Sequence, residues 1–164
     1  MKILITTALL FLSLSLFAQK NIVGHYRNYF GSRIELNADS TFKYSWRFDL
    51  SYSWTKGTWS SKEDTLYFHT IPTYDTISYK NSDGSSADKL ILSVDETPER
   101  FTPEQYASMG LSSGGQNMQS YPDKLFFEKG RLYQVDKGRL IVKKQKGFWG
   151  TKKKWNPWYF KSDD

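Results

Sequence analysis

The stretch from Thr41 to Thr55, TFKYSWRFDLSYSWT, alternates strictly between two kinds of side chain. Every even position is apolar or aromatic, and every odd position is polar. A period of two is typical of a β-strand with one buried face, because successive side chains of a strand point to opposite faces. The pattern therefore predicts an aromatic face, formed by Phe42, Tyr44, Trp46, Phe48, Leu50, Tyr52 and Trp54.

This run is too long for one ordinary strand. At about 3.3 Å per residue it would extend about 50 Å, whereas most strands hold about 5 to 6 residues. Either a hairpin interrupts the run, or one long curved strand is shared between two sheet faces. A hairpin that keeps the even positions on one face requires an odd number of loop residues, such as Asp49-Leu50-Ser51 with the leucine at the tip.

Turn-forming residues divide the sequence on both sides of this run into further short strands. Gly31-Ser32 and Asn37-Ala38-Asp39-Ser40 predict hairpin turns before it. Farther along, Glu128-Lys129-Gly130 and Asp136-Lys137-Gly138 predict three-residue hairpins with a left-handed glycine. We expect about ten strands in mostly sequential order, which favours an all-β fold: an antiparallel meander that forms a closed barrel or a two-sheet sandwich.

Strand patterns are absent from residues 95–122. Within this stretch Thr102 is a helix N-cap residue, Pro103 occupies the first helical position, and Gln105 the capping-box position. These residues predict one short helix from Pro103 to Met109 inside a long loop. A loop of this length is either a functional lid or a disordered insertion.

The N-terminus has the pattern of a secretory signal peptide. Lys2 is followed by an apolar run that ends at Phe17, and the sequence becomes polar after Ala18. The run is shorter than the roughly 20 residues that cross a bilayer, so we expect cleavage near Ala18 and no membrane span afterwards. The expected product is exported, periplasmic or secreted, with residues 1–18 as signal peptide and residues 19–164 as a single β domain.

The chain contains no cysteine, which excludes disulfides, thiol nucleophiles, cysteine-ligated metals and a lipid-modified cysteine at the cleavage site. The histidines, His25 and His69, lie in predicted strands and belong to no catalytic or metal-binding motif. We predict no metal, no cofactor, no catalytic residue and no enzymatic activity. A hydrolase in which two carboxylates such as Glu35 and Asp49 meet in space stays open as a third alternative.

Several short segments resemble the lipocalin-like domains of exported bacterial proteins, many of which have no known function. The similarity covers mainly residues 22–70, and Gly24-His25-Tyr26 stands where lipocalins have Gly-x-Trp. The resemblance implies a small, lipocalin-like barrel that holds an apolar ligand, and it transfers no binding residue. The segments that carry it are Ile34-Glu35-Leu36-Asn37-Ala38-Asp39-Ser40-Thr41-Phe42, Gly57-Thr58-Trp59 and Asp64-Thr65-Leu66-Tyr67-Phe68.

The first functional hypothesis is a non-enzymatic binding module for an apolar or amphipathic small ligand. If the aromatic face lines a hollow barrel, its side chains are the ligand site; if other strands cover that face, the same side chains form the core. The residues concerned are Phe42, Tyr44, Trp46, Phe48, Tyr52, Trp54 and Trp59.

The second hypothesis follows from positive charge near the C-terminus. Between Lys124 and Lys161, twelve Lys and Arg residues stand against only Glu128 and Asp136. Lysines mixed with aromatic residues bind anionic polymers through charge and stacking. For an exported protein we expect an anionic envelope glycan or lipid, and no nucleic acid, although the lysines can instead protect strand edges while the tryptophans fill the core. The candidate residues are Lys143, Lys144, Lys146, Trp149, Lys152, Lys153, Lys154, Trp155 and Trp158.

Overall fold

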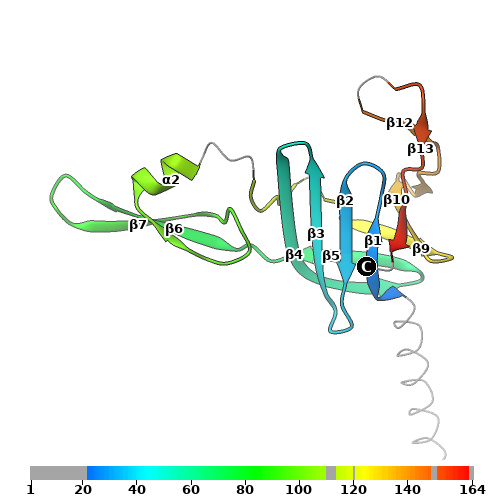
Figure 1. The fold of residues 1–164 in the computed structure, drawn as a ribbon. Helices are drawn as coiled ribbons and strands as arrows, with labels where there is room; N and C mark the ends of the chain where they lie inside the picture. Colours follow the sequence, from blue (N-terminus) through cyan, green and yellow to red (C-terminus); the bar gives the residue numbers. More distant parts are fainter. Residues whose placement is uncertain (1–21, 110–113, 120, 149–150, 163–164) are drawn as a thin grey trace, which may run out of the picture.

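The structure is a computed structural model that describes residues 22–109, 114–119, 121–148 and 151–162. The predicted signal peptide and its cleavage position near Ala18 lie outside these residues. The described residues form an antiparallel, closed β-barrel of eight strands, together with extra strands and one short helix (Figure 1). The predicted all-β fold class is confirmed, and of the two predicted architectures the chain adopts the barrel.

The barrel is an up-and-down meander with two insertions. Its strands are β1 (Gly24–Arg27), β2 (Ser32–Leu36), β3 (Thr41–Phe48), β4 (Ser51–Lys62), β5 (Thr65–Thr70), β9 (Lys124–Glu128), β10 (Arg131–Asp136) and β14 (Tyr159–Ser162). Each strand pairs with the next barrel strand along the chain. β14 closes the barrel, because it pairs with β10 on one side and with β1 on the other.

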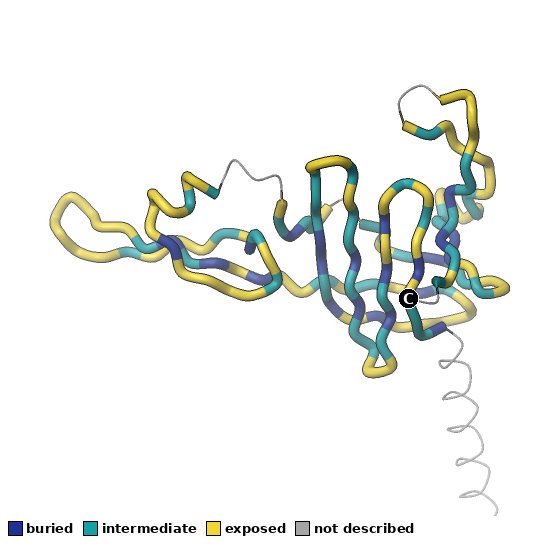
Figure 2. Tube along the Cα trace, viewed as in Figure 1, coloured by how far each residue is buried: buried dark blue, intermediate teal, exposed yellow. Residues whose placement is uncertain are grey.

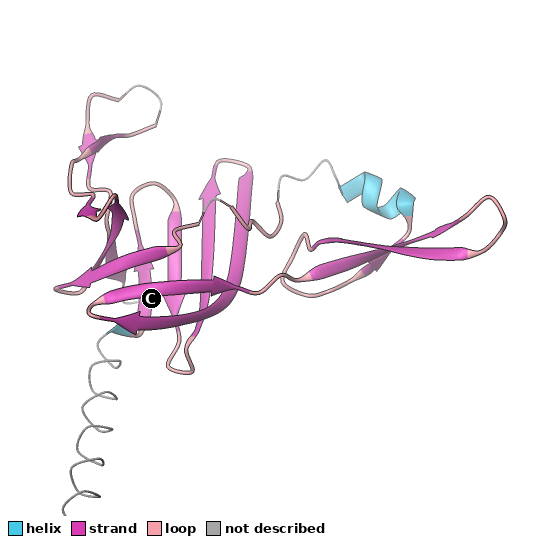
Figure 3. Ribbon diagram, turned by 180° about the vertical axis from the view of Figure 1, so that it is seen from behind, coloured by secondary structure: helices cyan, strands magenta, loops and turns pink. Residues whose placement is uncertain are grey.

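The first insertion, between β5 and β9, forms an arm that projects from the side of the barrel (Figure 1, Figure 3). It contains β6 (Tyr74–Lys80), β7 (Ser86–Leu92), β8 (Arg100–Phe101) and the helix α2 (Pro103–Met109). The helix has the predicted bounds and the predicted cap, since the Gln105 N–H donates to Thr102 Oγ1 and the Thr102 N–H donates to Gln105 Oε1. Besides this helix, the segment predicted as a long loop, residues 95–122, contains the short strand β8.

The second insertion, between β10 and β14, lies at one end of the barrel (Figure 1). It contains β11 (Arg139–Leu140), β12 (Gln145–Lys146) and β13 (Lys154–Trp155). β11 extends the barrel sheet by pairing with β10, whereas β12 and β13 pair with each other as a small separate hairpin.

The alternating run folds as the β3–β4 hairpin, but the predicted odd-numbered loop is wrong. Phe48 pairs with Ser51, so the loop is the two-residue segment Asp49-Leu50, with the leucine at an exposed tip. An even number of loop residues places even positions of β3 opposite odd positions of β4, as in the pair of Tyr44 with Thr55. The two strands therefore do not share one even-numbered aromatic face.

The predicted three-residue hairpins are also shorter than expected. Glu128 pairs directly with Arg131, and the turn between β10 and β11 is built in the same way. In each turn the lysine before the glycine also has a positive φ, 49° at Lys129 and 47° at Lys137. Both are consistent with type I′ turns, which need two left-handed residues and match the twist of the strands.

The core fills the end of the barrel that carries the β2–β3 turn, where Figure 2 colours the strands as buried. The rings of Phe42 and Phe68 meet edge to face with their centroids 4.8 Å apart. The space between these rings and Tyr121 leaves no room for a water molecule. This end of the barrel is solid, and its buried residues include Tyr26, Ile34, Leu36, Phe42, Trp59, Leu66, Leu125, Leu132 and Tyr159.

Gly57 marks the point where β4 changes its neighbour. From Gly57 to Lys62 the strand pairs with β5, whereas before it Trp54 forms an isolated parallel bridge with Gln116. A Cβ atom at position 57 would lie 2.0 Å from the carbonyl oxygen of His69. Only glycine allows the two backbones to approach this closely.

Candidate functional site

A cavity of about 510 Å³ opens at the end of the barrel that carries the β1–β2 turn. We call it the mouth cavity. Its lining comes from several barrel strands and from both insertions, and the lining residues carry no formal charge. Its volume lies in the range of pockets that hold small organic molecules, about 300 to 1,000 Å³.

The floor of the mouth cavity is a buried polar network. The Ser32 Oγ and Tyr44 hydroxyl oxygens lie 3.1 Å apart, and the buried Tyr159 hydroxyl interacts with both residues and with Gln134. Burial raises the pKa of Tyr44 and of Tyr159. Both hydroxyls therefore stay neutral at physiological pH, and each can donate or accept a hydrogen bond.

Aromatic side chains form one wall of the mouth cavity. The Trp46 Nε1–H donates to the carbonyl oxygen of Phe30 at 2.9 Å, which fixes the orientation of the indole. The ring of Phe148 lies 5.9 Å from Phe30 and 4.1 Å from Phe48 between centroids. Because Phe148 belongs to the second insertion, the wall joins that insertion to β3 and to the β1–β2 turn.

Amide side chains complete the lining. Asn28 Oδ1 accepts hydrogen bonds from the backbone N–H groups of Phe30, in the β1–β2 turn, and of Ser32, at the start of β2, at 2.9 and 3.1 Å. The backbone N–H of Asn117 donates to the carbonyl oxygen of Trp54 at 2.7 Å, which holds the end of the first insertion against β4. Gln145 adds an amide from β12. These groups give the cavity several donors and acceptors beside its aromatic wall.

One buried hydroxyl near the mouth cavity lacks a hydrogen-bond partner within the described ranges. Thr55 is fully buried, and its Oγ1 atom is unpaired. It lies opposite Tyr44 and two residues from Ser53, and both of these residues line the mouth cavity. Buried polar atoms in folded proteins are nearly always satisfied, so this hydroxyl is a candidate contact for a water molecule or a ligand group.

The structure separates the seven aromatic residues that the sequence predicts as a ligand site. Tyr44 and Trp46 line the mouth cavity, and Phe48 packs against its wall through Phe148. Phe42 and Trp59 belong to the solid core and do not line the cavity.

Tyr52 and Trp54 lie on the outer face of β4, because the two-residue loop inverts the faces of that strand. The prediction that they share a face with the aromatic residues of β3 is therefore wrong. The ring of Tyr52 lies 5.3 Å from the Arg47 guanidinium carbon. Trp54 is fully buried against the arm, and its Nε1–H donates to the carbonyl oxygen of Val94 at 3.0 Å.

Buried polar side chains fix the base of the arm to the barrel. Gln116 Oε1 accepts from the Thr73 N–H at 2.6 Å, and Gln116 Nε2 donates to the carbonyl oxygen of Ile71 at 2.8 Å. The buried Asp75 carboxylate accepts from Ser93 Oγ at 2.8 Å and from two backbone N–H groups at 2.9 and 3.1 Å. We call this group, together with Trp54, the arm base.

The residues of the predicted anionic surface divide into exposed lysines and packed tryptophans. Trp155 packs on Tyr29 with ring centroids 4.6 Å apart, and Trp158 packs on Tyr133 at 5.6 Å. Trp149 lies outside the described residues. The lysines are exposed on and beside the β12–β13 hairpin, and they are Lys143, Lys144, Lys146, Lys152, Lys153 and Lys154.

The carboxylates that the sequence suggests for a hydrolase do not line the mouth cavity. Glu35 lies within β2 and Asp49 at the β3–β4 turn, and neither lines the cavity. In the described part of the chain, no group of His, Asp and Glu has the arrangement of a metal site. No helix among the described residues has the length and apolar composition needed to cross a membrane.

Comparison with known proteins identifies no relative of this chain. No family model matches the chain, and neither a curated protein nor a solved structure matches it.

Proposed function

We propose that the protein is a binding module that holds an uncharged, amphipathic small ligand in the mouth cavity. The main support for this proposal is that a single cavity of about 510 Å³ combines a polar floor with an aromatic wall. Small-molecule sites typically have this composition, with a few placed polar groups among apolar surfaces. Among the described residues, the lining supplies no carboxylate, imidazole or amine, which supports binding and not acid–base catalysis.

The two halves of the lining define the ligand. A hydroxyl, carbonyl or amide group of the ligand binds the floor at Ser32, Tyr44 and Gln134. A flat apolar body packs against Trp46 and Phe30, and the Trp46 indole is held in place by its hydrogen bond to the backbone carbonyl oxygen of Phe30. A charged group is disfavoured in this cavity, because the lining has no opposite charge to compensate for its loss of water.

The solid end of the barrel limits the length of the ligand. Phe42 and Trp59 occupy the interior beyond the polar floor. A lipid chain that runs through the whole barrel is therefore not the proposed ligand. The proposed ligand lies within the mouth and keeps part of its surface in contact with solvent.

We place this role in an exported protein, periplasmic or secreted. The signal-peptide pattern that ends near Ala18 supports export. The resemblance to lipocalin-like domains supports the same role, because a closed barrel with an open mouth suits the carriage of a small ligand.

A fluorescence titration tests the proposal with N-phenyl-1-naphthylamine, an uncharged fluorescent amphiphile. We expect saturable binding to the full chain, and a loss of affinity of about tenfold or more in Trp46→Leu and in Gln134→Leu. The matched control is Tyr52→Leu, which removes an aromatic ring from the outer face of the same hairpin. Unchanged affinity in both cavity variants, or an equal loss in the control, would contradict the proposal.

A further inference from the structure

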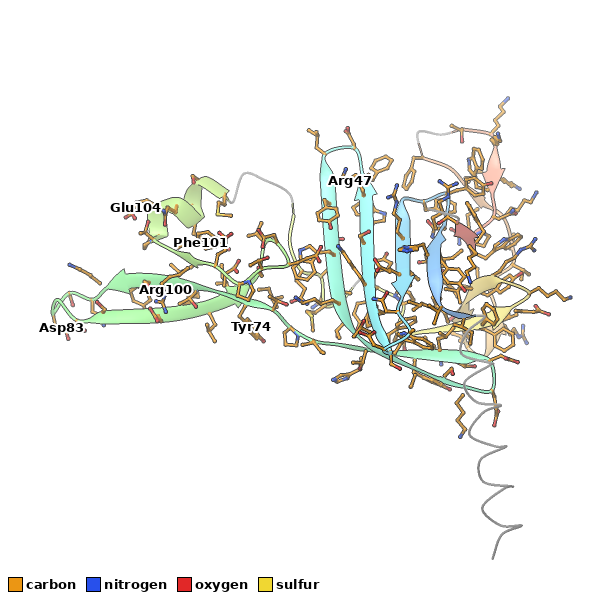
Figure 4. All side chains as sticks on the ribbon, turned by 60° about the horizontal axis from the view of Figure 1, so that its bottom comes forward. Arg47, Tyr74, Asp83, Arg100, Phe101 and Glu104 are labelled. Carbon is orange, nitrogen blue, oxygen red and sulfur yellow. The ribbon has the colours of Figure 1, made fainter. Side chains whose placement is uncertain are left out.

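A second concave surface lies on the outer wall of the barrel. A groove of about 620 Å³ crosses the outer faces of β1, β2 and β3, and each of these strands contributes one arginine to it. The arginines are Arg27, Arg33 and Arg47, and we call the surface the arginine groove. Figure 4 labels Arg47 near the end of β3 that leads into the β3–β4 turn. We propose that the arginine groove binds ligands that carry two or more phosphate or sulfate groups.

The described acidic residues form no salt bridge with the three arginines of the groove. Nor does any of these acidic residues line the groove. Lys43 also lines the groove, but it forms an ion pair with Glu96. Glu35, on the same face of β2, lies opposite His25 and Lys43 and not opposite an arginine.

Two of the arginines occupy neighbouring positions on paired strands. Arg27 and Arg33 are cross-strand partners in the β1–β2 pair. Side chains in such positions start about 4.5 to 5.5 Å apart at Cβ, and like charges placed there destabilise a sheet. An oxyanion between the two guanidinium groups removes this repulsion, so the folded protein favours an occupied groove.

Aromatic rings hold two of the guanidinium groups in place. The Cζ atom of Arg27 lies 5.4 Å from the ring centroid of Phe160, and that of Arg47 lies 5.3 Å from the ring of Tyr52. A guanidinium group above a ring keeps its N–H edges available for bidentate hydrogen bonds to oxyanions. Because the rings already restrict these side chains, less conformational entropy is lost on binding.

The same contacts argue against recognition through nucleic acid bases. Tyr29 also lines the groove, but its ring packs on Trp155 at 4.6 Å and on Phe160 at 5.3 Å. The rings of Phe160 and Tyr52 therefore support the protein's own guanidinium groups, and the half-exposed Tyr29 is already packed against two other rings, so none of the three is a free stacking platform for bases. Recognition falls to the anionic groups, which small polyphosphates and sulfated polymers have in common.

The proposal is tested by calorimetric titration of the full chain at low ionic strength. Inorganic tripolyphosphate serves as the small polyphosphate and dextran sulfate as the sulfated polymer. The test variant is R27Q/R33Q/R47Q, and the matched control, K143Q/K144Q/K146Q, removes the same number of positive charges from exposed positions near the β12–β13 hairpin. We expect affinity to fall about tenfold or more in the arginine variant and less than about threefold in the lysine variant.

The pattern of results decides both the site and the source of the ligand. Binding of tripolyphosphate alone assigns the groove to small polyphosphates, and binding of dextran sulfate alone assigns it to a sulfated polymer. An equal loss in both variants, a loss only in the lysine variant, or no binding of either probe would overturn the proposal. Tighter binding of single-stranded oligothymidylate than of dextran sulfate would overturn recognition through anionic groups alone.

A single substitution guards against misfolding as the cause of lost binding. Arg33→Gln removes the like-charge pair, so we expect its Tm in the absence of ligand to be equal to or higher than that of the unmodified chain. We also expect tripolyphosphate or dextran sulfate to raise the Tm of this variant less than it raises that of the unmodified chain. A lower Tm with an unchanged ligand effect would contradict the proposed role of Arg33.

Discussion

Buried tyrosines carry polar groups into the interior of the barrel. The Tyr26 hydroxyl donates to the carbonyl oxygen of Ile22 at 2.6 Å, and burial raises the pKa of Tyr26 to about 12. Burial also raises the pKa of Tyr44 and Tyr159 at the cavity floor. In each case the fold favours the neutral phenol over the phenolate, because the charged form loses its water when buried.

These pKa shifts predict a loss of stability at alkaline pH. The free energy of unfolding should be insensitive to tyrosine ionisation below about pH 10, the usual pKa of the unfolded side chain. It should fall as the pH rises from there through about 12, the folded pKa of Tyr26. Urea unfolding at a series of pH values measures this. Tyr26→Phe should lower stability at neutral pH by about 1 kcal/mol and reduce the alkaline slope; an unchanged slope would contradict the assignment.

A second prediction at this scale concerns Gly57. Gly57→Ala should lower the free energy of unfolding by about 1 to 3 kcal/mol or more, because the new Cβ would clash with the His69 carbonyl oxygen. The control is Gly84→Ala, where φ is +82° but no atom lies within 4 Å. It carries only the backbone strain, about 1 to 2 kcal/mol. Equal losses in the two variants, measured by chemical denaturation, would show that contact with His69 is unimportant.

Single residues of the mouth cavity differ in how well the sequence predicts them. Tyr44 and Trp46 follow from the alternating pattern of β3. Ser32, Gln134 and Phe148 do not, because small polar and single aromatic residues carry no motif and meet only when the barrel closes. The two-residue period of a strand places Gln134 on the same face of β10 as the buried Leu132, and this is the one local signal that identifies it.

The arm shows how an insertion between two barrel strands is anchored. Its strands are tied together by Arg100, which donates to both carboxylate oxygens of Asp88 at 2.8 and 2.9 Å and also contacts Ser78. Figure 4 shows Arg100 and Phe101 on this sheet and Asp83 at its tip. These contacts join strands of the arm to one another, whereas the arm base contains the buried groups that hold the arm to the barrel.

The arm base should behave as a separate source of stability. Gln116→Leu leaves the Thr73 N–H and the Ile71 carbonyl oxygen without their side-chain partner, at a cost of about 1 to 3 kcal/mol for each buried group. We expect faster amide hydrogen exchange in β6 to β8 and little change in β1 to β3. As control, Arg100→Gln removes an exposed ion pair and should cost less than about 1 kcal/mol. Uniformly faster exchange over the whole chain would contradict the prediction.

At the scale of elements, strand pattern and helix caps are predictable, whereas loop lengths are not. The bounds of α2 follow from Thr102, Pro103 and Gln105, because a cap is a local arrangement. The faces of β4 depend on how many residues the β3–β4 loop contains, and the alternating pattern alone does not determine that number. Lysine in a left-handed conformation at Lys129 and Lys137 also goes against residue preference, and strand pairing overrides that preference.

The barrel as a whole depends on a strand at the far end of the chain. β14 bridges β10 and β1, and the paired residues Phe160 of β14 and Arg27 of β1 are separated by most of the described sequence. Local periodicity carries no information about such a contact, so the sequence predicts strands and a meander but leaves barrel and sandwich as alternatives. Closure also brings the four residues of the polar floor, from β2, β3, β10 and β14, into one site.

Removal of β14 should therefore unfold the whole barrel and not merely remove one strand from it. A chain that ends at Trp155 leaves unpaired edges on β1 and β10, and we expect loss of the cooperative thermal transition with exposure of apolar surface. Circular dichroism and dye binding measure both effects. In contrast, replacement of residues 81–85 at the β6–β7 tip by Asn-Gly should keep the barrel transition. A cooperative transition in the truncated chain would contradict the proposed importance of closure.

The two-residue turn at Asp49-Leu50 has a consequence for how this chain tolerates change. Surface turns usually tolerate insertions and deletions. Here one added or lost residue would invert the whole of β4 and bring Trp54 and Lys56 inward in place of Thr55 and Gly57. In descendants and engineered forms of this chain, the turn is expected to change length only by pairs of residues, so that parity, and not length or composition, is the conserved property.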